Sequence, residues 1–105
     1  MTEVVVCSTS DVKPGSATRV DVEGHRLAIV RLDESSWYAI GDRCTHAEAS
    51  LSEGEVWVDE REIECPMHGA VFSLVTGEPQ TLPATQPVPT YEVRVEGDQV
   101  KVTLP

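Results

Sequence analysis

The chain has 105 residues, with 18 acidic and 8 basic side chains and a formal net charge of −10. Hydrophobic residues make up 40% and charged residues 25%, so we expect one ordinary globular domain spanning residues 1–105. The excess of acid argues against a nucleic acid or an anionic membrane as partner, because both require a basic surface. It favours a partner with a basic docking face.

The first residues do not have the pattern of a targeting sequence. Met1-Thr2-Glu3 contains no basic segment, and the apolar run Val4–Cys7 is too short for a signal peptide. No apolar run approaches the ~20 residues of a membrane span. We therefore expect a cytoplasmic protein, in which thiols stay reduced and cysteines serve as ligands or catalysts more often than in disulfides. An odd cysteine count of three agrees with this expectation.

Short β-branched runs separated by turn residues predict an all-β, antiparallel fold. The expected strands are Glu3–Ser8, Ala17–Val22, His25–Arg31, Trp37–Ile40, Val56–Val58, Ile63–Cys65, Val71–Ser73, Tyr91–Glu96 and Gln99–Thr103. Tight turns are expected at Glu23-Gly24, Thr76-Gly77 and Gly97-Asp98. Two loops, about 41–54 and 64–72, interrupt the strands, and Pro83–Pro89 forms a third loop that its prolines stiffen.

Each of the first two loops contains one cysteine and one histidine. They are Cys44-Thr45-His46 and Cys65-Pro66-Met67-His68, and a predicted hairpin between them brings the loops side by side. Two sulfur and two nitrogen ligands suit either a tetrahedral zinc ion or a Rieske [2Fe–2S] centre. The mixed loops favour the binuclear centre, because each loop can then give a sulfur to one iron and a nitrogen to the other. Zinc remains the alternative.

The paired loops resemble the ligand motif of Rieske-type ferredoxins. The resemblance extends to Trp37–Ile40, Leu51–Gly54, Val71–Ser73 and Leu82–Tyr91, and so covers about residues 3–103. It implies an antiparallel β-sandwich of the Rieske fold with a small cluster-binding subdomain of two loops. It also implies one [2Fe–2S] cluster per subunit, with Cys44 and Cys65 on one iron and His46 and His68 on the other, more exposed iron.

This chain departs from the Rieske subunits of respiratory cytochrome complexes at four positions. Those subunits resemble it but carry two further cysteines, joined in a disulfide, where Ala49 and Met67 stand here. They also place a serine and a tyrosine, which donate hydrogen bonds to cluster sulfurs, where Ala70 and Phe72 stand here. Such bonds stabilise the reduced state, so their loss predicts a low reduction potential, on the order of −150 mV.

The resemblance implies a one-electron carrier, not an enzyme. Similar proteins pass electrons from a flavin-dependent ferredoxin reductase to the terminal oxygenase of ring-hydroxylating dioxygenase systems, through transient contacts. Others are associated with iron–sulfur cluster assembly, and Ser50–Val56 and the Pro83–Pro89 loop suit that group somewhat better. A zinc-stabilised binding module and the small subunit of an assimilatory nitrite reductase are further alternatives. A catalytic iron with two histidines and a carboxylate is excluded, because the cluster leaves only His25. A monomer is expected.

The remaining residues of interest have simple interpretations. Cys7 is expected to be a buried small hydrophobe, and His25 an exposed residue of its hairpin. Trp57 fits either a core or an exposed docking aromatic, and Met67 either shields the cluster or shapes its loop. Six acidic residues near the ligand loops form either ordinary surface or a docking face for a basic partner: Glu48, Glu53, Glu55, Glu60, Glu62 and Glu64.

Overall fold

The computed structural model describes residues 2–44, 49–67, 69–80 and 86–105. Its strands are β1 (Thr2–Ser8), β2 (Ser16–Val22), β3 (His25–Arg31), β4 (Trp37–Gly41), β5 (Val56–Trp57), β6 (Glu62–Glu64), β7 (Val71–Ser73), β8 (Thr90–Glu96) and β9 (Gln99–Leu104). Every predicted strand is therefore confirmed, and no end differs by more than one residue. Two short 3-10 helices, η1 (Thr9–Asp11) and η2 (Leu51–Glu53), were not predicted.

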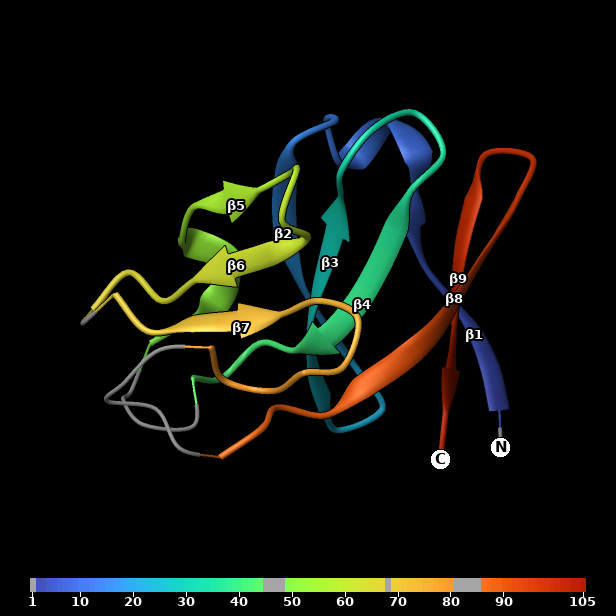
Figure 1. Ribbon diagram of the computed structural model, residues 1–105. Helices are drawn as coiled ribbons and strands as arrows, with labels where there is room; N and C mark the ends of the chain where they lie inside the picture. Colours follow the sequence, from blue (N-terminus) through green and yellow to red (C-terminus); the bar gives the residue numbers. More distant parts are fainter. Residues whose placement is uncertain (1, 45–48, 68, 81–85) are drawn as a thin grey trace.

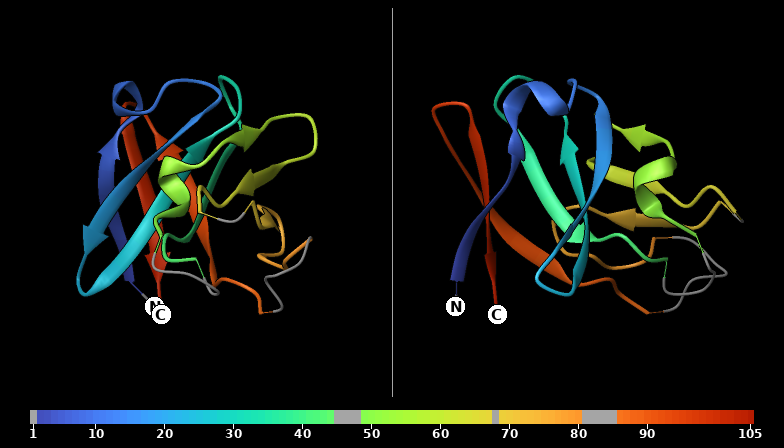
Figure 2. Two further views of the ribbon diagram at one scale, coloured as in Figure 1. Left: turned by 90° about the vertical axis from the view of Figure 1, so that its left-hand side faces the viewer. Right: turned by 180° about the vertical axis from the view of Figure 1, so that it is seen from behind.

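The strands form two antiparallel sheets. The larger sheet has the order β1-β9-β8-β4-β3-β2, and the smaller has the order β5-β6-β7. Figure 1 shows the small sheet lying beside β2–β4, with the β8–β9 hairpin and β1 on the opposite side of the molecule. The two further views show the large sheet curling, so that its strands cross at a steep angle (Figure 2). The predicted architecture, an antiparallel all-β body with a small subdomain beside it, is confirmed.

Two hydrophobic cores share strand β3. Leu27 and Ile29 point into the core that the curled sheet encloses with Val100 and Val102 of β9. Ala28 and Val30, on the other face of β3, belong to the core beneath the small sheet. All four of these β3 side chains are fully buried, because alternate residues of a strand face opposite sides and both sides are covered here.

The predicted roles of the single residues have mixed outcomes. His25 is half-buried, with its ring edge-on to that of Tyr91 at a centroid distance of 6.1 Å, so the expectation of an exposed turn residue is wrong. Cys7 is half-buried against the core of the curled sheet, and burial, with nearby Asp11, raises its pKa to about 11. Trp57 is 40% exposed, which decides against a core position.

Within the described ranges, no helix is long and apolar enough to cross a membrane.

Candidate metal centre

The two cysteine loops are closed in the same way. The backbone N–H of Cys44 donates to the carbonyl of Ala49 at 3.0 Å, and that of Cys65 donates to the carbonyl of Ala70 at 2.6 Å. Each bond spans five residues, so each loop begins at a cysteine and returns to a small residue beside it. The predicted ligands His46 and His68 fall inside these two spans and lie outside the described residues.

Both cysteine side chains are shielded from water. Cys44 is 2% exposed and Cys65 fully buried, and both belong to the core beneath the small sheet, together with Leu51, Ile63 and Phe72. Neither forms a disulfide. Two buried thiols at the heads of two matching loops fit a group that takes two sulfur ligands from separate segments. Among the described residues, no three His, Cys, Asp or Glu side chains group closely enough to hold a metal ion.

Close backbone packing joins the exit of the first loop to the entry of the second. Gly54 follows η2, and a Cβ at this position would lie 1.6 Å from the carbonyl oxygen of Glu64, the residue before Cys65. The neighbouring Glu55 carbonyl accepts a hydrogen bond from the Glu64 N–H at 2.9 Å. Only glycine allows the two segments to approach this closely, so Gly54 helps to set the spacing between the two cysteine loops.

The end of the third loop, Pro83–Pro89, is held by a backbone hydrogen bond to the turn after β7. The N–H of Val88 donates to the carbonyl of Gly77 at 2.8 Å, and a Cβ on Gly77 would lie 2.1 Å from the Val88 carbonyl oxygen. Gly77 itself has a φ of +79°, as the predicted turn after β7 requires. Val88 is buried in the same core as Cys44 and Cys65.

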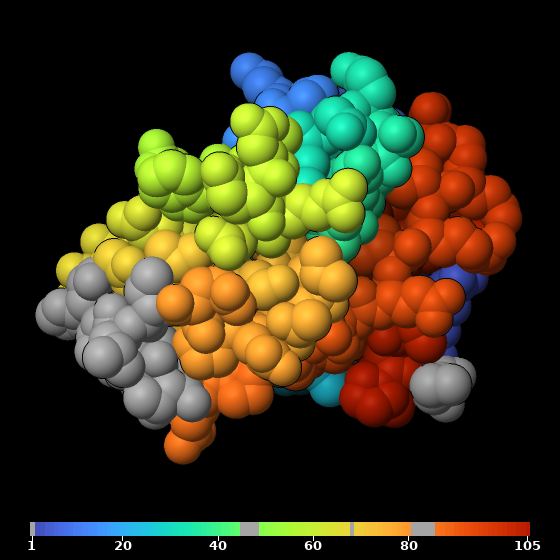
Figure 3. Space-filling view, in the orientation of Figure 1, coloured from blue at the N-terminus to red at the C-terminus, as the bar shows by residue number. Residues whose placement is uncertain are grey.

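The surface over the small sheet is acidic. Residues 51–80 carry seven acidic side chains and a single basic one, Arg61, and they cover much of the face shown in the space-filling view (Figure 3). Trp57 pairs with Glu62 across β5 and β6, so the two side chains share the outer face, opposite buried Ile63. Met67, in the second ligand loop, is 58% exposed.

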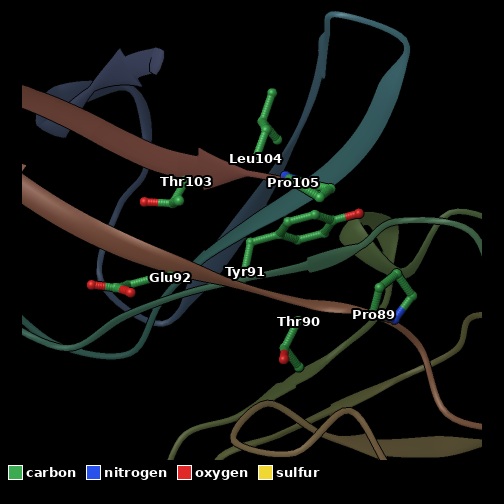
Figure 4. A pocket seen from close by; sticks show the side chains of 7 residues that line it. All are labelled: Pro89, Thr90, Tyr91, Glu92, Thr103, Leu104 and Pro105. Carbon is green, nitrogen blue, oxygen red and sulfur yellow. The ribbon is translucent and has the colours of Figure 1, made fainter. Parts of the chain in front are cut away.

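A pocket of about 340 Å³ lies elsewhere, where the paired ends of β8 and β9 meet (Figure 4). It is lined by Pro89, Thr90, Tyr91, Glu92, Thr103, Leu104 and Pro105. Neither cysteine of the ligand loops lines this pocket, so it belongs to the body of the fold and not to the cysteine-bearing end.

Comparison with known proteins identifies the family. Residues 2–92 match the family described as "Rieske [2Fe-2S] domain". The chain belongs to the Rieske [2Fe–2S] domain family. The Rieske chain is 42% identical over 105 residues to the 3-phenylpropionate/cinnamic acid dioxygenase ferredoxin subunit of Escherichia coli (strain K12), covering all of this chain and 96% of that protein.

Solved structures give the same assignment for this Rieske domain. The ferredoxin of carbazole 1,9a-dioxygenase from Nocardioides aromaticivorans IC177 is 42% identical, with a TM-score of 0.90 and 97% of each chain covered. A complex of reduced oxygenase and oxidized ferredoxin in carbazole 1,9a-dioxygenase matches at 42% identity and a TM-score of 0.84, covering 95% of this chain and 91% of that one. The chain is a Rieske [2Fe–2S] ferredoxin of the dioxygenase type, an electron carrier, as predicted.

The zinc-stabilised module is thereby set aside, and the cofactor of this Rieske ferredoxin is a [2Fe–2S] cluster. Sequence reasoning missed the role of Gly54 in the close contact between the two cysteine loops. The Leu51–Gly54 segment was part of the family resemblance, but a glycine between two acidic residues does not itself indicate a close backbone contact.

Proposed function

We propose that this ferredoxin passes single electrons from a flavin-dependent ferredoxin reductase to the terminal oxygenase of a ring-hydroxylating dioxygenase system. The observation that carries the proposal is full-length similarity to two dioxygenase ferredoxins at 42% identity, combined with the matching closure of the two cysteine loops. One of the similar structures is itself a complex of an oxygenase with its ferredoxin. We further propose that residues 1–105 act as one Rieske domain, as a monomer in the cytoplasm.

The proposed ligands are the thiolates of Cys44 and Cys65 and the imidazoles of His46 and His68. When bound, the cluster supplies reversible one-electron chemistry, at a potential that its two neutral nitrogen ligands raise above that of a four-cysteine centre. The buried thiols exclude water from the sulfur-bound side. The apolar side chains of Ile63 and Phe72 extend that dry surrounding, and a hydrophobic shell is one of the factors that tune a metal centre's potential.

Loss of one proposed ligand tests the assignment. We expect Cys65→Ala and His46→Ala to lose the visible absorption and the Rieske electron paramagnetic resonance (EPR) signal, since no other thiol or imidazole stands in either loop. Cys7→Ala is the matched control, because Cys7 lies in β1 and should leave both signals intact. A full Rieske signal in either ligand variant would refute the assignment.

The acidic outer face of the small sheet is the proposed docking surface for basic partners. Exposed Trp57 lies among carboxylates there, and aromatic residues are enriched at the energetic centres of interfaces. Glu64 connects this face to the second ligand loop, since its Oε2 would lie 3.7 Å from a Cβ on Gly69. Complementary charge speeds encounter without requiring tight binding, which suits a shuttle.

Docking is tested with a cognate reductase and oxygenase. We expect the electron-transfer rate to fall as ionic strength rises, and Glu62→Gln to weaken that salt dependence. Glu92→Gln, an equal change of charge on β8 of the large sheet, serves as control and should have a smaller effect. A rate that does not respond to salt would exclude electrostatic steering.

A further inference from the structure

We propose that Asp42 and Arg26 are positioning residues of the redox centre. Their ion pair holds together the two ends of the first ligand loop, here called its neck (Asp42 on the entry side, Leu51 and Ser52 on the exit side), and thereby positions the bound cluster. This inference rests on the ligand assignment proposed above. It concerns two side chains that are not themselves proposed ligands.

Asp42 ties together the two ends of the loop. It follows β4 and precedes the loop, and its Oδ1 accepts a hydrogen bond from the N–H of Ser52, beyond the loop, at 2.9 Å. Its backbone carbonyl accepts a second bond from the N–H of Leu51 at 2.6 Å. One residue at the entry therefore holds two consecutive residues at the exit.

Arg26 fastens this neck to the body of the fold. Its Nε donates to Oδ2 of Asp42 at 2.8 Å, and its Nη2 donates to Oγ of Ser50. Its backbone carbonyl also accepts a hydrogen bond from the Asp42 N–H at 3.0 Å. Since Arg26 belongs to β3, whose core-facing side chains are fully buried, the loop is anchored to the most enclosed strand.

The side chain of Asp42 is fully buried, and both of its carboxylate oxygens accept a hydrogen bond, Oδ1 from the N–H of Ser52 and Oδ2 from Nε of Arg26. Among the described residues, no side-chain nitrogen or oxygen that is fully buried lacks a hydrogen-bond partner. A buried carboxylate is retained only where such bonds satisfy it. The Asp42 carboxylate stands two residues before Cys44 in the chain. It therefore influences the position of the first proposed sulfur ligand and the electrostatic potential at the redox centre.

Shape and charge can be separated by two variants. Asp42→Asn keeps the shape, but its amide nitrogen cannot accept a hydrogen bond, so one of the two side-chain ties is lost along with the negative charge. Arg26→Lys keeps the charge, but a single ammonium cannot reproduce the fork that reaches both Asp42 and Ser50. Arg26 is about a third exposed (32%), so the lysine variant should fold.

The test measures cluster release to a chelator and the midpoint reduction potential of the loaded protein. Groups hydrogen-bonded directly to metal ligands typically contribute about 10- to 100-fold in metal affinity. Asp42 and Arg26 act one step further from the ligands, so we expect both variants to release the cluster up to about 10-fold faster than wild type. Asp42→Asn should also shift the potential upward, because a negative charge near the site is removed. Arg26→Lys should leave the potential closer to that of wild type.

A control separates positioning from general stability. Val102→Ala removes buried volume from the core of the curled sheet, on the far side of β3, and should lower the melting temperature while leaving the potential unchanged. Wild-type release and potential in both Asp42→Asn and Arg26→Lys would overturn the inference, as would the same shift of potential in Val102→Ala. Such results with a normal wild-type Rieske signal would leave the proposed function standing. A wild type without that signal would overturn both.

Discussion

Replacement of Gly54 by alanine tests whether the two ligand loops depend on one close backbone contact. The added Cβ would lie 1.6 Å from the carbonyl oxygen of Glu64 and 3.3 Å from that of Leu51. Real Cβ atoms stay at least 3.0 Å from such atoms, and backbone cannot rotate away as a flexible side chain can. The end of η2 and the start of the second loop must therefore separate.

The free-energy change follows from what that separation breaks. Forced overpacking typically destabilises a protein by about 1–3 kcal/mol. The hydrogen bond from the Glu64 N–H to the Glu55 carbonyl is at risk as well, which adds about 1 kcal/mol. We expect Gly54→Ala to lower the free energy of unfolding by about 3 kcal/mol. For a domain of this size, that lowers the melting temperature by roughly 12–24 °C.

The assay is thermal melting followed by circular dichroism, with the cluster content per chain measured on the same samples. Gly24→Asn is the matched control. Gly24 has a φ of +81°, with nothing within 4 Å of an added Cβ, and asparagine tolerates that conformation. The control should change stability by about 0.5 kcal/mol or less. If Gly54→Ala melts within a few degrees of wild type, or matches Gly24→Asn, the contact does not hold the loops together.

Three further outcomes are expected. Ala70→Ser should raise the midpoint potential in a redox titration, because a hydroxyl next to the second ligand loop can donate to a cluster sulfur; an unchanged or lower potential would contradict this. Alkylation of Cys7, followed by peptide mapping, should accelerate up to about pH 11, since burial raises its pKa to about 11 and little thiolate exists below that; a plateau below pH 9 would be inconsistent with the burial. Phe72→Ala should destabilise the protein by about 3–5 kcal/mol in chemical denaturation, because the ring is fully buried; a loss below about 1 kcal/mol would show that the core collapses around the gap.

Local pattern was sufficient to predict the strands and the position of the two cysteine loops. Strand β3 reads as a β-branched and apolar run ended by Arg31, and the turn at Glu23-Gly24 has the positive φ at both residues that a tight hairpin needs. The two loops could be found because cysteine and histidine at short spacing have few other uses in a reduced compartment. These features depend only on neighbours in the chain.

Contacts between residues far apart in the chain could not be predicted from local sequence pattern. Arg26 meets Asp42 because β3 and β4 pair in one particular register, in which Leu27 lies opposite Gly41. His25 meets Tyr91 because β8 joins the sheet next to β4, and a single sequence does not specify that order of strands. The exposure of Trp57 depends on which face of the small sheet packs inward, and a strand of two residues is too short to reveal this by alternation.

Strand β3 contributes buried side chains to both cores, so the stability of the core that contains Cys44 and Cys65 is coupled to the stability of the core inside the curled sheet. Neither core can open without exposing side chains of β3, because its two faces belong one to each. The amide hydrogens of Leu27 to Val30 should therefore be among the slowest to exchange with solvent. Thermal unfolding should therefore open both cores in a single transition, with no intermediate that keeps one core and loses the other.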